Sequence, residues 1–232
     1  MCTPKELLIL IVVVVAVAVA PLSAGPVSMV FSTNVGQTRV FRGEISGLGL
    51  STVGTVTVTD LNVVDGSGGV FSGFDLDFLL LDVDGVLATT GDQVLPFQTA
   101  ATTVTPGTIA PSAAYVPTVA HPGTLFGLNA DSSIDFGTAT IGTRDGSYVA
   151  PLSVDTSDGW VSLGYGGSLS AAFPLTPVGE SLYIFLGEVS TKSAERACIT
   201  VDPGPVIPAP GAIFLGVLGT SIVAGLRRRR AL

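Results

Sequence analysis

The chain carries an uncharged apolar run at each end, and these runs limit the folded part to the residues between them. Leu7 to Ala20 is an unbroken apolar stretch that follows Lys5. It matches the core of a signal peptide and is short for a membrane-spanning helix, which needs about 20 residues. We therefore expect residues 1–24 to be a signal peptide cleaved after Ala24, because Ala24 is small enough for the cleavage position. An uncleaved anchor is the alternative, since Glu6 offsets the charge of Lys5.

The second apolar run, residues 211–226, is followed directly by Arg227, Arg228, Arg229 and Arg230. As a helix it would be about 24 Å long, somewhat less than the roughly 30 Å hydrocarbon core of a bilayer. The arginines favour a cytoplasmic end, which places the preceding residues outside the cell. We therefore expect 211–232 to be one transmembrane helix with an arginine-rich tail, held in the inner membrane through residues 211–226.

Pro208-Ala209-Pro210 stands immediately before Gly211, at the end of a proline-rich segment, 203–210, that predicts a stiff stalk. A proline motif, a short apolar helix and a terminal arginine cluster, in this order, resemble the PEP-CTERM sorting signal read by exosortases. The resemblance covers residues 208–232, with Ala209 where the family usually has Glu. It implies that an exosortase-like membrane protease cuts near the proline motif. The inner-membrane precursor would then reach the cell surface or the extracellular matrix, in a bacterium with an exopolysaccharide system. The alternative is an ordinary tail anchor that is not cleaved.

The segment between the two apolar ends is acidic. Residues 25–210 contain five Lys or Arg and 17 Asp or Glu, a net charge of −12. Such a surface repels phosphate backbones, which excludes nucleic-acid binding. His121 is the only histidine, and Cys198 is the only cysteine after the leader, so a zinc site and an internal disulfide are both unsupported. No Gly-x-Ser-x-Gly motif is present. We expect a non-catalytic protein.

Alternating apolar and polar residues predict an all-β ectodomain over 25–202, a β-sandwich or jelly roll. In 53–64, Val56 and Val58 share one face while Thr55, Thr57 and Thr59 share the other. In 71–83 the apolar face changes within the strand, which indicates a bulge or a change of sheet. Prolines are dense in 94–125 and exclude a helix or a central strand there. This crossing would join the halves 25–93 and 124–202, as two domains or within one sandwich. Further strands are expected near 134–141, 147–154, 159–163, 167–175, 181–189 and 197–202.

A glycine-rich pattern lies in the second half. Leu163-Gly164-Tyr165-Gly166-Gly167-Ser168-Leu169 is followed by Phe173 and then by residues 182–188, LYIFLGE. It is similar to a stretch found in bacterial secreted β-sandwich surface proteins with C-terminal anchors. Ser181 stands where those proteins often have Asp. The resemblance implies a strand pair and no particular activity.

Carboxylates are the remaining candidates for chemistry. Asp82, Asp84 and Asp92, with Gly85 at the turn, resemble half of a calcium loop, because alternate carboxylates place oxygens on one side. Val86 stands where an EF-hand would carry a third oxygen ligand, and an ordinary solvated Asp-Gly turn is the alternative. Two further functions stay open: a calcium-stabilised adhesive module, and a carbohydrate-active hydrolase using the carboxylates between residues 75 and 92. The carboxylates considered for the hydrolase are Asp75, Asp77, Asp82 and Asp84.

Overall fold

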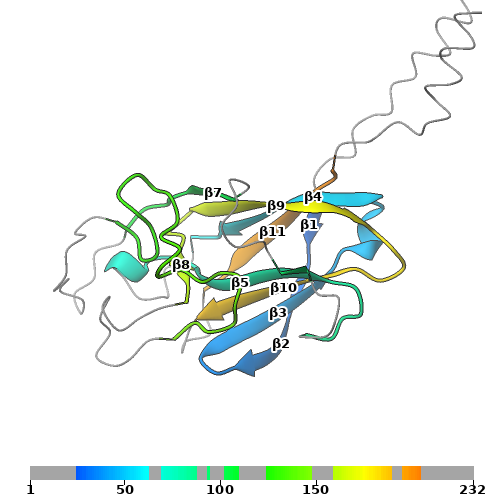
Figure 1. Cartoon of the computed structure of the whole chain (residues 1–232), viewed down its shortest axis with the longest axis horizontal. Coiled ribbons are helices and arrows are strands. Elements are labelled where there is room, and N and C mark those ends of the chain that lie inside the picture. The colour runs from blue at the N-terminus through cyan, green and yellow to red at the C-terminus, as the bar shows by residue number, and fades with distance from the viewer. Residues whose placement is uncertain are drawn as a thin grey trace, which may run out of the picture.

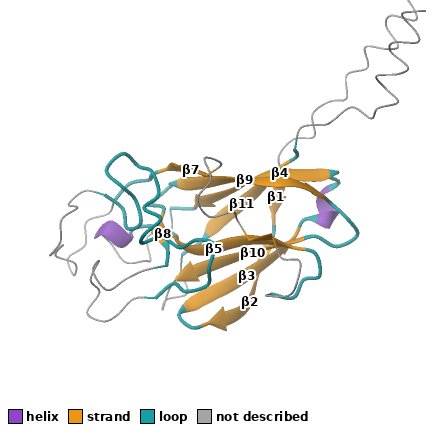
Figure 2. Ribbon diagram, viewed as in Figure 1, coloured by secondary structure: helices purple, strands orange, loops and turns teal. Residues whose placement is uncertain are grey.

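The computed structural model describes residues 25–62, 69–87, 93–94, 102–109, 124–147, 159–189 and 195–204. These residues form an all-β structure of two antiparallel sheets packed face to face as a β-sandwich, as Figures 1 and 2 show. No helix within these ranges is both long and apolar enough to cross a bilayer. The predicted signal peptide (1–24) and transmembrane helix (211–226) lie outside the described residues.

Both sheets contain strands from either side of the proline-rich crossing. The five-stranded sheet has the order β1-β11-β4-β9-β7. Its strands are β1 (Gly25–Val27), β4 (Thr52–Asp60), β7 (Thr102–Thr105), β9 (Ser168–Pro177) and β11 (Ala197–Asp202). The six-stranded sheet has the order β2-β3-β10-β5-β6, with β8 also paired to β5. Its strands are β2 (Met29–Val35), β3 (Thr38–Glu44), β5 (Asp75–Asp82), β6 (Gln93–Val94), β8 (Val161–Ser162) and β10 (Tyr183–Val189). Two short 3₁₀ helices, η1 (Ser46–Leu48) and η2 (Gly69–Phe71), precede β4 and β5.

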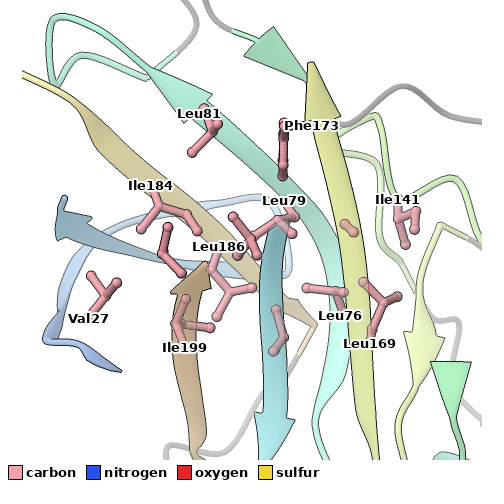
Figure 3. Close-up of a cluster of buried hydrophobic side chains, with 14 of the residues drawn as sticks. Val27, Leu76, Leu79, Leu81, Ile141, Leu169, Phe173, Ile184, Leu186 and Ile199 are labelled. Atoms are coloured by element: carbon pink, nitrogen blue, oxygen red, sulfur yellow. The ribbon is translucent and has the colours of Figure 1, made fainter. Parts of the chain in front are cut away.

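The core lies between the sheets, and the two-residue period of the strands fills it. In β4, Val56 and Val58 are fully buried, in the alternation expected for a strand with one face on the core. Val53 joins them in the core because the register of β4 shifts between Val53 and Thr55. Figure 3 shows the cluster, with Leu169 of β9 and Leu186 of β10 approaching from the two sheets. The sequence prediction of an all-β sandwich is confirmed at this level.

Strand β5 contains the irregularity that its sequence predicts. Leu76 pairs with Glu188 and Leu79 with Leu186, so Asp77 and Phe78 together face Gly187 on β10. This is a β-bulge, and it reverses which residues face the core. Leu76, Leu79 and Leu81 pack between the sheets. Phe78 and Leu80 instead join a separate buried cluster with Val40 and Phe185.

The prediction of a strand over 134–141 is wrong. Residues 124–147 form successive turns, and Leu128 and Ile134 are joined by an isolated bridge. The Asp131 carboxylate accepts the Ser133 N–H at 3.0 Å, and Asp135 accepts the Gly137 N–H at 3.0 Å. Side chains that bond the backbone two residues on favour turns over sheet ladders. The predicted strand 147–154 lies almost wholly outside the described residues.

The sequence analysis also missed the first three strands, within residues 25–44, and the edge strand β7 inside the proline-rich crossing. β7 ends directly before Pro106 and pairs with β9 alone. An edge position is where a flanking proline is tolerated, because the missing N–H need not enter a ladder.

Gly187 is required by the bulge. A Cβ on this residue would lie 2.4 Å from the Phe78 ring and 2.8 Å from the Thr38 methyl group. We predict that Gly187→Ala lowers the free energy of unfolding by about 1–3 kcal/mol, the usual cost of overpacking. Urea denaturation of the full-length chain in detergent measures this. Gly179→Ala, where no atom lies within 4 Å of the added Cβ, is the control. Equal stability of the two variants would contradict the prediction.

Candidate functional site

Buried carboxyl groups gather at one end of the sandwich, where β4 and β10 finish and β5 begins. Asp60, Asp75, Glu188 and Glu195 are 2%, 7%, 0% and 6% exposed. Burying a carboxylate is costly unless hydrogen bonds or opposite charges compensate for the lost water. The four groups are compensated to different extents, and burial raises the pKa of Asp75, Glu188 and Glu195.

Both carboxylate oxygens of Asp60 accept hydrogen bonds from backbone N–H groups. Its Oδ1 accepts the Asn62 N–H at 2.8 Å and the Gly166 N–H at 2.9 Å, and its Oδ2 accepts the Phe74 N–H at 3.1 Å. These donors come from the end of β4, the turn before β9 and the residue before β5. One side chain therefore joins both sheets at this end, as a structural tie.

Glycines let the backbones around Asp60 touch. A Cβ on Gly73 would lie 2.4 Å from the Gly164 carbonyl carbon, and one on Gly107 would lie 2.4 Å from the Gly167 nitrogen. Residues 163–167 of the pattern therefore form a packed turn, and Ser168 and Leu169 begin β9. The implied strand pair is not formed, because β9 and β10 lie in different sheets.

Asp75 lies at the start of β5 under an aromatic group. Its Oδ1 accepts a hydrogen bond from the Ser162 hydroxyl. The Trp160 ring lies close to Asp75 and packs against the Phe126 ring at a centroid distance of 4.5 Å. Burial raises the pKa of Asp75 well above its ordinary value, more than the hydrogen bond from Ser162 lowers it. Trp160 itself is 1% exposed and fills this end of the sandwich.

Glu188 and Glu195 are compensated less than Asp60 and Asp75. Glu188 follows Ile184 and Leu186 in the inward phase of β10, and its carboxyl group accepts no backbone N–H among the described residues. Burial raises its pKa to about 7, and the facing Arg39 on β3 offsets part of that rise. Burial also raises the pKa of Glu195 to about 10, with further contributions from the negative charges of Asp75 and Glu188.

Asp77 lies on the opposite face of β5 from Leu76. It accepts hydrogen bonds from the Thr38 hydroxyl and from the Gly146 N–H, the latter at 3.0 Å. Burial raises its pKa to about 6, although both hydrogen bonds lower it. Asp77 thereby joins β3, β5 and the turn segment 124–147.

The residues predicted to bind calcium lie at the C-terminal end of β5 and beyond it, away from Asp75. Asp82 Oδ1 accepts the Asp84 N–H at 3.1 Å, and Asp84 Oδ1 accepts the Val86 N–H at 2.8 Å. Two consecutive turns of this kind account for the sequence Asp-Val-Asp-Gly without a metal. Asp92 lies outside the described residues. Within the described part of the chain, no three His, Cys, Asp or Glu side chains are grouped so that they could hold a metal ion. The calcium site stays a prediction.

The alternative prediction, a carbohydrate-active hydrolase, would use the carboxylates of Asp75, Asp77, Asp82 and Asp84. Of these, Asp77 and Asp82 are 0% exposed and Asp75 is 7% exposed, so they are closed off from a polymeric substrate. Asp84 is exposed, in the turn after β5. Sequence reasoning missed Asp60, Glu188 and Glu195. For Glu188 a signal existed, since a carboxyl in phase with Ile184 and Leu186 must face the core.

The sorting residues Pro208, Ala209, Pro210, Gly211 and Arg227 to Arg230 lie outside the described residues. Comparison of the chain with protein-family models, with curated proteins and with solved structures found no match. The evidence for function is therefore the chain's own sequence and geometry.

We predict that Asp60→Asn lowers the free energy of unfolding by about 1–3 kcal/mol, because the amide nitrogen would face a buried N–H donor. Chemical denaturation of the full-length chain measures this loss. Asp84→Asn is the matched control, since its side chain is exposed and the amide oxygen can accept the Val86 N–H. A loss no larger than that of the control would show that Asp60 is not a tie.

We further predict that stability falls as pH rises. The folded-state pKa of Glu188, about 7, lies above its ordinary 4.5, so the folded chain holds this proton more tightly than the unfolded chain. The stabilisation is complete below pH 4.5 and is lost as the pH rises to about 7 for Glu188, and to about 10 for Glu195. Melting temperatures across this range should decline, and less steeply up to pH 7 in Glu188→Gln. Glu180→Gln, at an exposed position, should leave the profile unchanged. An unchanged profile in Glu188→Gln would contradict the assignment.

Proposed function

We propose that this chain is an exported protein of the bacterial cell envelope or extracellular matrix. A signal peptide (1–24) exports it, the helix 211–226 holds the precursor in the inner membrane, and an exosortase-like protease cuts near Pro208–Pro210. The jelly-roll-like sandwich would then act at the surface by binding or structure, with exopolysaccharide as partner, and without catalysis. The observation that carries the proposal is the order of the three parts of the tail. A proline motif is followed by a short apolar run and then by four arginines.

The position of the first strand supports the export step. β1 begins at Gly25, the residue directly after the predicted cleavage position, so cleavage would leave every described strand intact. Gly25 pairs with Val201 on β11, near the end of the last strand. The first described residue and the end of the last strand therefore lie side by side, at the edge of the five-stranded sheet where Figure 1 labels β1 and β11. A leader and a tail would thus be attached to the domain at neighbouring points.

The point where the tail leaves the sandwich supports the cutting step. A Cβ on Gly54 would lie 2.6 Å from the Gly204 Cα, so the backbone of the last described residue rests on β4. Only residues 205–207 separate Gly204 from Pro208. Even fully extended, this distance is at most about 14 Å. A protease acting at the membrane would therefore bind the proline motif close to the folded domain. The domain would thus restrict where the cleavage site can lie.

We predict that replacing Arg227, Arg228, Arg229 and Arg230 with Ser, or deleting 208–232, stops processing and surface delivery in the native cell. The reason is that the arginines fix the orientation of the helix and complete the sorting signal. Intact-mass measurement of the surface form should place its first residue at Gly25 and its last near Pro208–Pro210. Arg196→Ser, which removes an exposed arginine of the sandwich, is the control. A surface form that still carries Leu232, or delivery that survives the deletion, would overturn the proposal.

A further inference from the structure

Small hydroxyl side chains predominate on the outer face of the five-stranded sheet, where the strand pairing also places Pro26, Ala172, Cys198 and Asp202. In β4, Thr55, Thr57 and Thr59 point away from the core, because Val56 and Val58 between them are buried. Residues directly opposite one another in a sheet share a face. The pairing therefore places serines and threonines of the neighbouring strands on this same side.

Strand register aligns these hydroxyls in rows. One row runs across four strands through Thr103, Ser170, Thr57 and Thr200, and Thr57 Oγ1 lies 2.9 Å from Ser170 Oγ. Neighbouring strands are about 4.8 Å apart, and successive residues on one face are about 6.7 Å apart. The result is a regular array of groups that each donate and accept hydrogen bonds. A parallel row contains Thr105, Ser168, Thr59 and Cys198.

This face lacks charge, although the domain is acidic. Among its described residues, charged side chains stand only at the two ends of β11, Arg196 and Asp202. The hydroxyl side chains are exposed on β7 and partly exposed on β4, β9 and β11. The corresponding face of the six-stranded sheet differs, because Val40, Phe78 and Phe185 form a buried apolar cluster there. The hydroxyl array is thus a property of one face and not of the whole surface.

We propose that this hydroxyl array binds a linear, uncharged, hydroxyl-rich polysaccharide. The inference deepens the proposed function by naming the contact surface and the class of glycan, and it depends on that function. Sugar hydroxyls donate and accept as the array does, and threonine methyl groups can pack on the C–H groups of a sugar ring. The net charge of −12 over residues 25–210 disfavours an anionic glycan.

The inference requires a long polysaccharide chain and not a short oligosaccharide. A hydrogen bond made in place of one to water contributes little, and association has a large fixed entropic cost. A few such bonds to a short oligosaccharide therefore give no measurable affinity. A long chain that follows a row across four strands makes many contacts at once and binds repeatedly along its length.

The test measures retention of the full-length chain, kept soluble in detergent, on insoluble neutral glucan and mannan and on insoluble pectate. We expect retention on at least one neutral polymer, little on pectate, and no competition by trisaccharides. The variant Thr57→Val, Ser170→Ala and Thr200→Val removes the central row and should reduce retention at least tenfold. Ser32→Ala with Thr33→Val is the matched control, because it removes two exposed hydroxyls from β2 on the other sheet and should have no effect. Circular dichroism checks that each variant is folded.

Four outcomes overturn the inference: no retention on either neutral polymer, stronger retention on pectate, equal retention of the two variants, or a dimer in sedimentation that the row variant dissociates. The last would make the face a contact between copies of this chain. None of these outcomes affects tail processing, which the mass of the surface form measures separately. If the protein is processed and delivered to the surface but binds no neutral polysaccharide, only the glycan inference is wrong.

Discussion

Exclusion of water from between the two sheets is the constraint on which the other features depend. It selects the buried valines of β4 and the inward leucines of β5 and β10, because alternate residues of a strand face opposite sides. The same exclusion makes every inward carboxyl expensive. The outer face of the five-stranded sheet lies outside this core and carries partly exposed serine and threonine side chains.

The buried carboxyl groups share one apolar environment but differ in their hydrogen-bond partners. Asp60 receives three backbone N–H groups and works as a tie between the sheets. Glu188 receives none among the described residues and is balanced only in part by Arg39, so its pKa rises to about 7. Hydrogen-bond donors favour the charged form of a buried carboxyl, and their scarcity around Glu188 leaves burial as the dominant effect on its pKa.

The location of the two chain ends connects the fold with the proposed sorting. β1 and β11 pair at one edge of the five-stranded sheet, with Gly25 opposite Val201, so the first strand begins beside the end of the last strand. The buried acidic groups Asp60, Asp75 and Glu188 lie at the opposite end of the strands, where β10 finishes. Processing at the tail would therefore take place away from this cluster.

Sequence alone determined the all-β class and the alternation in β4, because these depend on the two-residue period of a strand. It also indicated the change of face in β5, as either a bulge or a change of sheet, and the structure shows the bulge. It also defined the tail motif, which is a local pattern of residues. It did not find the strands within 25–44, and it misread 134–141, where Asp131 and Asp135 bond their own backbone and form turns. Only the tertiary structure brought Asp60, Glu188 and Glu195 together and aligned Thr57 with Thr103 and Thr200. Both results depend on which strands pair and in what register, and that is decided by contacts between residues far apart in the chain.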